Sequence, residues 1–213
     1  LGNVGALEGG GVCRLALTDQ DRDGRNLVHS WMKDLGLSTR IDRIGNVVGI
    51  RKGTQDGAPV MVGSHIDSVA TGGLYDGTLG VLAGLEAVHT LNDAGITTRY
   101  PVAVGFFTNE EGARFTPDMM GSAVHQGSLP LDQALETVGT DGQSVGSELE
   151  RIGYSGDMPV KDLVPRAYLE LHIEQGPVLE ESGTTIGAVT GVQGISWTEF
   201  MFSGVSNHAG TTP

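Results

Sequence analysis

The spacing of apolar residues first changes to a helical period after Thr18. Thr18 followed three residues later by Asp21 resembles a capping box, which is typical of a helix start. Apolar residues then recur at helical spacing before Gly36: Leu27, Val28, Trp31, Met32 and Leu35. The pattern predicts an amphipathic helix between Thr18 and Gly36.

Continuous apolar runs predict the strands of a central sheet. Segments 46–50, 59–69 and 100–107 are such runs, and "PVMVGSHIDSV" at 59–69 is apolar enough to be buried on both faces. Between the last two, residues 79–92 repeat apolar side chains at helical spacing and end near Gly95. The order strand, helix, strand predicts a crossover connection between strands of one sheet.

The second half of the chain is less regular. Residues 128–153 predict two short helices separated by the glycine-rich "GTDGQ", which we expect to form a surface excursion. Segment 166–175 is again strand-like, and the chain from residue 184 onward alternates as antiparallel strands do. We therefore expect an α/β fold with a mixed central sheet flanked by helices, occupying residues 1–199, and the beginning of a second, smaller unit at 200–213.

Composition excludes several classes of protein. The chain has 213 residues, with 13 Lys and Arg against 26 Asp and Glu, and its net charge of -13 would repel a nucleic acid. Its apolar runs are far shorter than a membrane span needs, so we expect no membrane partner. Cys13 is the single cysteine, which fits a reducing compartment, and we expect a soluble, cytoplasmic protein.

Polar side chains follow the predicted strands at the places where ligands bind in open α/β sheets. They are His65 and Asp67, Asp76, Glu110 and Glu111, and His172 and Gln175. Each of them alone is commonly a turn residue, a helix cap or a satisfied polar group. Together, imidazoles and carboxylates from separated segments predict a site for zinc, manganese or a similar metal.

Two short spacings sharpen the prediction of a metal site. In His65-x-Asp67 both side chains lie on one side of a strand, so the carboxylate can orient the imidazole. The neighbours Glu110 and Glu111 repel each other, and a nearby metal ion offsets that repulsion. A nucleotide site is not expected, because no glycine-rich run is followed by a Lys-Ser or Lys-Thr pair.

Four ordered motifs carry a resemblance to a known family: "GSHIDSV...GGLYDGTLGV", "TNEEGARF", "LELHIEQGPVLE" and "GVSNHAGTTP". From about residue 10 onward the chain resembles the amidase, hydantoinase and carbamoylase branch of the M20 metallopeptidase family. The resemblance implies a zinc-exopeptidase-like catalytic domain followed by the start of an α+β lid or dimerisation domain. It also implies hydrolysis of the carbamoyl C–N bond of N-carbamoyl amino acids by a homodimeric enzyme with two divalent metal ions (Zn, or Mn, Co or Ni).

The resemblance also implies a role for each site residue. His65, Asp76, Glu111 and His172 would hold the metals, with Asp76 as the bridge. Glu110 would be the general base, and Asp67 would support His65. Gln175 would reach the substrate or metal region. His208 of "NHAGTTP" would hold the carbamoyl oxygen as negative charge develops.

Departures from the family pattern keep alternatives open. Complete members return from the lid to the catalytic domain to supply a further histidine ligand and substrate-gripping residues, so we expect this chain to be an N-terminal fragment. The stretch around Asp76 differs from that of the peptidases in the family, which disfavours a di-metal peptidase. An allantoate amidohydrolase and a catalytically inactive binding module both remain alternatives.

Overall fold

The structure is a computed structural model that describes residues 1–213 apart from Trp197 and Pro213. Within the described residues, the strands form one five-stranded sheet in the order β1-β2-β4-β3-β5. The strands are β1 (Ser38–Ile41), β2 (Val47–Arg51), β3 (Val60–His65), β4 (Val102–Phe107) and β5 (Ala167–Leu169). β1, β2 and β4 pair antiparallel, whereas β3 pairs parallel with both β4 and β5. This arrangement confirms the predicted α/β fold with a mixed sheet.

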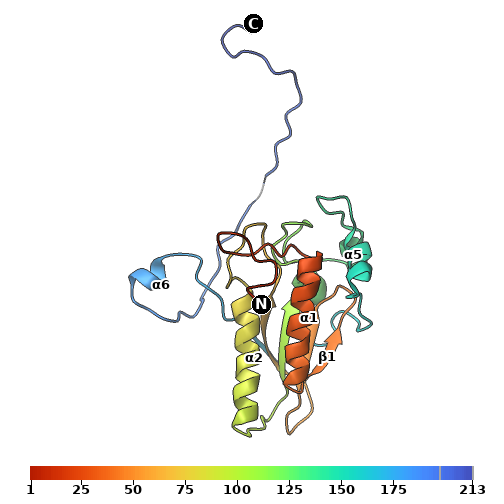
Figure 1. Ribbon diagram of the computed structural model, residues 1–213, viewed down its shortest axis with the longest axis vertical. Coiled ribbons are helices and arrows are strands. Elements are labelled where there is room, and N and C mark those ends of the chain that lie inside the picture. Colours follow the sequence, from red (N-terminus) through yellow and green to blue (C-terminus); the bar gives the residue numbers. More distant parts are fainter. Residues whose placement is uncertain (197, 213) are drawn as a thin grey trace. The chain divides into compact units, whose positions relative to one another are not determined.

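Two long helices cover one face of this sheet. α1 (Asp19–Asp34) begins as predicted, since the hydroxyl of Thr18 accepts a hydrogen bond from the Asp21 amide at 3.3 Å. α2 (Thr78–Asp93) is the predicted crossover helix between β3 and β4. Figure 1 shows α1 and α2 side by side in front of the strands.

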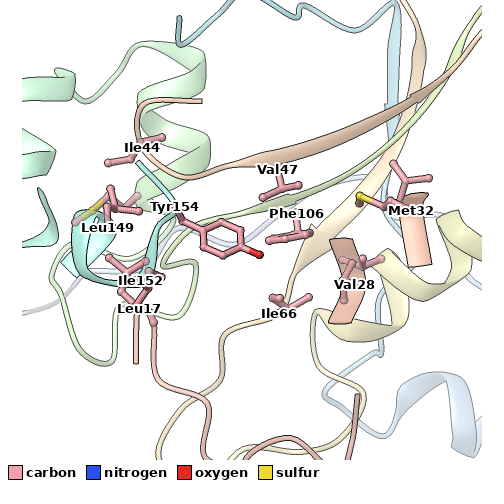
Figure 2. Packing of buried hydrophobic residues seen from close by; sticks show 14 of the residues in the cluster. Leu17, Val28, Met32, Ile44, Val47, Ile66, Phe106, Leu149, Ile152 and Tyr154 are labelled. Carbon is pink, nitrogen blue, oxygen red and sulfur yellow. The ribbon is translucent and has the colours of Figure 1, made fainter. Parts of the chain in front are cut away.

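The main core lies between these helices and the sheet. Apolar residues on one face of the central strands, among them Val104 and Phe106, belong to the same buried cluster as apolar residues of both helices. Figure 2 shows Tyr154 between the α5 residues and the residues of the sheet and α1: Leu149, Ile152, Val47, Phe106, Val28 and Met32. All six of these side chains are buried, and they fix the position of α5 on the sheet.

The chain between β4 and β5 contains one helix more than its sequence predicts. α4 (Leu131–Glu136) and α5 (Val145–Ile152) are the two expected helices, and Ser144 caps α5 by accepting a hydrogen bond from Ser147. α3 (Met120–Gln126) was not predicted. Its seven residues have no strong apolar period, and its first turn is held by long-range backbone contacts instead.

The contacts divide the chain into two compact units, Leu1–Ile173 and Glu174–Pro213. The second unit contains α6 (Val178–Glu181). The predicted strands beyond residue 184 are wrong, because none of the described residues in 184–212 forms a strand. A strand requires a hydrogen-bonded neighbouring strand, and the described residues of that segment pair with none. The predicted domain boundary at 199/200 stays a prediction.

No helix in the described part of the chain is long and apolar enough to cross a lipid bilayer. The longest helices, α1 and α2, have 16 residues each.

Candidate metal centre

The candidate residues gather at one edge of the sheet because β3, β4 and β5 run parallel and end there. His65 is the last residue of β3, and Asp76 lies two residues before α2 begins. Glu110 and Glu111 follow the end of β4, and His172 follows the end of β5. Five residues that are far apart in the sequence are therefore presented from four segments of the first unit.

Three of them form a group that could hold a metal ion. One ligand atom each of His65, Asp76 and His172 lies within 4.8 Å of the others, in the part of the chain that the structure describes. His65 is buried, whereas 35% of the His172 side chain is exposed. Two imidazoles and one carboxylate are the ligand types that zinc and manganese prefer. Glu111, an expected ligand, is not part of this group in the described structure.

The hydrogen bonds of both imidazoles suit metal ligands. His65 Nδ1 lies 3.0 Å from the backbone oxygen of Asp67, and His172 Nδ1 lies 2.7 Å from that of Ile173. A carbonyl oxygen can only accept, so Nδ1 is the donor in both rings, and in the neutral imidazole Nε2 then keeps the lone pair that a metal ion needs. Metal-binding histidines typically have one ring nitrogen fixed in this way.

The two Nε2 atoms face carboxylates. His65 Nε2 lies 3.3 Å from Glu110 Oε2, and His172 Nε2 lies 3.2 Å from Asp76 Oδ1. A lone pair next to a carboxylate oxygen is repulsive unless a proton or a cation lies between them. The donor set therefore fits a divalent cation.

Asp67 has a different partner from the one that the sequence suggests. Its carboxylate lies 3.8 Å from His65 Nδ1, and the ring bonds to the backbone carbonyl of Asp67 instead. The two carboxylate oxygens accept the backbone N–H groups of Glu110 and Glu111, each at 3.2 Å. Asp67 thus fixes the backbone of the Glu110–Glu111 pair.

The charges of the site also favour a cation. Burial raises the pKa of Glu110 and that of Glu111, and the neighbouring carboxylates of Asp67 and Asp76 raise both further, while His65 opposes them. Burial lowers the pKa of His65, but the carboxylates of Asp67 and Glu110 outweigh that effect, so its pKa is raised. A bound divalent ion would compensate this excess of negative charge.

Gly77 makes room for the imidazole of His65, a role that the sequence analysis missed. Its backbone is left-handed, with φ of 63°, and a Cβ atom there would lie 2.4 Å from the His65 ring. Only glycine tolerates both the conformation and the close approach. A glycine directly after the candidate ligand Asp76 was the signal available in the sequence.

A cavity of about 580 Å³ opens beside Glu110, within the first unit. Its lining includes Phe107 and Tyr168, with Glu170 at one side, and Tyr168 donates a hydrogen bond to Glu170 at 3.1 Å. A mostly apolar cavity with a few polar groups is typical of a small-molecule site.

Gln175 and His208, the expected substrate contacts, lie in the second unit. Gln175 has a left-handed backbone with φ of 54°, and His208 Nδ1 accepts a hydrogen bond from the Gly210 amide at 3.1 Å. Their roles toward a substrate stay predictions.

Comparisons with known proteins place this geometry in context. Residues 61–209 match the model of the family described as Peptidase family M20/M25/M40. An N-carbamoyl-L-amino-acid amidohydrolase from Rhizobium meliloti is 47% identical over 100% of this chain and 51% of the relative. A ureidoglycolate hydrolase from Arabidopsis thaliana is 37% identical over 93% of this chain and 44% of the relative.

A solved structure shows the same likeness in three dimensions. A hydantoinase/carbamoylase family amidase from Burkholderia ambifaria has a TM-score of 0.85 and 51% identity, over 87% of this chain and 46% of that chain. This chain spans about half the length of the curated relatives it matches.

Proposed function

This chain belongs to the M20/M25/M40 peptidase family, as its motifs predicted, and we propose that it forms part of a metal-dependent hydrolase of ureido C–N bonds. The proposed substrates are N-carbamoyl amino acids, and the products are the amino acid, carbon dioxide and ammonia. The activity is proposed for a protein of the relatives' length that contains this chain, since the chain spans about half of them.

The observation that carries this proposal is the cluster of His65, Asp76 and His172, with Glu110 beside it. The ligand atoms of the two histidines and of Asp76 lie within 4.8 Å of one another, and Glu110 Oε2 lies 3.3 Å from His65 Nε2. A carboxylate beside a metal-binding group can act as the general base of metal-assisted hydrolysis. The name of the 47% identical relative supports the ureido substrate over a peptide.

The residues of the chain have distinct proposed roles. A divalent metal held by His65, Asp76 and His172 would lower the pKa of a water molecule and polarise the ureido carbonyl. Glu110 takes the proton of that water at a carboxylate oxygen and later returns it to the leaving nitrogen. Asp67 holds the Glu110 backbone in place through its hydrogen bond.

The remaining roles rest on the family likeness. Two metal ions are proposed, with Asp76 as the bridge and Glu111 as a further ligand, and zinc, manganese, cobalt or nickel would satisfy the donor set. Gln175 contacts the substrate region, and His208 stabilises the negative charge on the carbamoyl oxygen. Residues 200–213 would begin a lid domain through which the cytoplasmic enzyme dimerises.

Ureidoglycolate is a second candidate substrate, because the chain is 37% identical to a ureidoglycolate hydrolase. Allantoate, which carries two ureido groups, would undergo the same chemistry and was the alternative left open by the motifs. If the same site cleaved dipeptides instead, the protein would be a di-metal peptidase. A chain that binds no metal would be a binding module.

A substrate panel separates these alternatives. N-carbamoyl-L-amino acids, N-carbamoyl-β-alanine, allantoate, ureidoglycolate and dipeptides are offered to the metal-loaded enzyme, and ammonia release or amino-acid release is measured. The proposal predicts the highest kcat/KM for an N-carbamoyl-L-amino acid and loss of turnover with a chelator. Preferred cleavage of a dipeptide, or hydrolysis that survives metal removal, would contradict it.

A further inference from the structure

Arg114 is a buried cation in the loop that carries the Glu110–Glu111 pair, and the site described above does not use it. Only 6% of its side chain is exposed. Its Nη1 donates to the backbone oxygen of Ala16 at 2.9 Å, and its Nη2 donates to Asp141 and to Glu148, each at 2.6 Å. One guanidinium therefore joins the loop to the stretch before α1 and, at two places, to the 128–153 excursion.

The segments that it joins belong to the first unit. Glu148 lies in α5 and is also bound by Arg151, whose Nε lies 2.7 Å from Glu148 Oε1. Arg151 in turn donates to Asp19 at the start of α1 at 2.6 Å and to the backbone oxygen of Leu17 at 2.8 Å. The 128–153 excursion is thereby tied to both the start of α1 and the loop after β4.

The loop itself has a shape that needs support. Asn109, Gly112 and Met119 have left-handed backbones, with φ of 52°, 66° and 51°. Two of these three are not glycine, and such conformations persist only where surrounding contacts hold them. The Asn109 side chain donates to the backbone oxygen of Phe115 at 2.8 Å, and the Met119 amide donates to the backbone oxygen of Glu110 at 2.7 Å.

The free energy of the ion network does not by itself explain its presence. A buried ion pair is commonly no more stabilising than apolar residues of the same volume, because the charges lose their hydration. Its geometry is restrictive, however, since a planar guanidinium with several partners fixes direction as well as distance. The network is thus suited to fix a loop rather than to stabilise the fold.

We propose that Arg114 is a positioning residue, which acts through residues 108–119 to hold the Glu110 and Glu111 carboxylates at the metal centre, with the 128–153 excursion as its anchor. The proposal rests on the proposed function for what the carboxylates do. Asp67 fixes the pair from the side of β3. Arg114 fixes the same loop from the opposite end of the EEGARF segment.

The test uses Arg114→Lys, which keeps the charge, since one ammonium cannot bond Ala16, Asp141 and Glu148 together as the guanidinium does. Arg40→Lys is the matched control, because Arg40 forms an exposed ion pair with Asp162 at 2.7 Å, away from the loop. Val88→Ala, at a fully buried position of α2, controls for a general loss of stability.

The first readout is amide hydrogen exchange, which does not depend on activity. Arg114→Lys is expected to speed exchange at the Glu110 and Glu111 amides by about 10-fold or more relative to Val104 in β4. Arg40→Lys and Val88→Ala should leave that ratio unchanged. An unchanged ratio in Arg114→Lys would overturn the proposal, whatever the enzyme hydrolyses.

The second readout is the kinetics of the metal-loaded enzyme. Arg114→Lys is expected to lower kcat about 10- to 100-fold and to change KM by less than that, because the base and a ligand are displaced while most of the cavity lining lies outside the loop. A kcat equal to that of Arg40→Lys would contradict the proposal. If the unsubstituted enzyme hydrolyses no ureido substrate, the proposed function fails, and hydrogen exchange alone decides the role of Arg114.

Discussion

Each unit of the chain contains a segment whose apolar residues predict a strand, and the outcomes are opposite. The run at 59–69 forms β3, with Met61 2% exposed and Ile66 fully buried, because β4 and β5 pair with it on both sides. In the second unit the alternating residues are exposed, Val192 by 93% and Phe202 by 91%. An apolar pattern, continuous or alternating, therefore specifies a strand only where the chain also supplies the neighbouring strands.

The expected site residues are also divided between the two units. His65, Asp67 and Glu110 contact one another within the first unit, and the buried loops around them have hydrogen-bonded backbones. Gln175 and His208 belong to the second unit. The first unit thus contains a candidate metal-binding group and a candidate base whose geometry is set by its own residues, and the following substitutions test that contrast.

The largest expected effect is on the proposed catalysis, measured in a protein of the relatives' length that contains this chain. Glu110→Gln removes the proton acceptor and keeps the shape, so kcat for an N-carbamoyl amino acid should fall about 10²- to 10⁴-fold. Metal content and the free energy of unfolding should stay as they are. The exposed Glu150→Gln serves as the control. Unchanged turnover in Glu110→Gln with metal still bound would refute the assignment of the base.

Gly77→Ala tests whether the position of His65 depends on its surroundings. The added Cβ would lie 2.4 Å from the ring, so we expect metal affinity to fall about 10- to 100-fold and stability to fall by about 1 to 3 kcal/mol. Gly73→Ala in the same loop is the control, since nothing lies within 4 Å of its Cβ position. Isothermal titration with zinc measures the affinity, and equal affinities of the two variants would contradict the account.

The pH dependence of stability that Asp42 causes tests whether its carboxyl group is buried as the structure shows. Its carboxylate is 1% exposed and accepts hydrogen bonds from Asn46 and Ile44, and burial raises its pKa from 3.8 to about 6. A raised pKa contributes stability that is present below about pH 4 and is lost as the pH rises to about 6. The loss amounts to at most about 3 kcal/mol for a shift of this size.

Asp42→Asn should remove this part of the pH dependence. Asn cannot ionise, and its amide would also meet the Asn46 amide that now donates to Asp42, so the variant should be less stable at every pH. Urea unfolding between pH 4 and pH 7 measures both effects. Parallel stability curves for the variant and the unsubstituted chain would show that Asp42 does not titrate in this range.

The smallest effect is expected in the second unit. Val192→Ala should change the free energy of unfolding by less than about 0.5 kcal/mol, because the side chain is 93% exposed. Leu149→Ala, at a fully buried position, should cost about 2 to 5 kcal/mol. Comparable costs at the two positions, measured by thermal unfolding, would show that the contrast between the units is false.

The sequence predicted the elements whose signals are local. The cap at Thr18, the apolar run of β3 and the helical period of α2 each identify an element without reference to the rest of the chain. β1 was missed because it is a short edge strand with polar and half-exposed residues. α3 was missed because long-range contacts determine its start, where Met119 has a left-handed backbone.

The ligand residues of the candidate site could be predicted from the sequence, but most of the hydrogen bonds around them could not. Ligand types at strand ends predicted that His65, Asp76 and His172 lie together, because parallel strands end at one edge of the sheet. The hydrogen bonds of Asp67 to the Glu110 and Glu111 amides were not foreseen, since they depend on how the loop folds back. The hydrogen bonds of Arg114 were not foreseen for the same reason, as its partners lie in segments far away in the sequence.

The central claim is that His65, Asp76 and His172 hold a metal ion, and metal binding by the Asp76→Ala variant tests it most directly. The protein is loaded with zinc, freed of excess metal and analysed for bound zinc by atomic emission, with Asp93→Ala at the exposed far end of α2 as the control. The account predicts that the unsubstituted protein and Asp93→Ala retain zinc and that Asp76→Ala loses it at both proposed positions. Full zinc retention by Asp76→Ala would contradict the metal centre proposed for this protein.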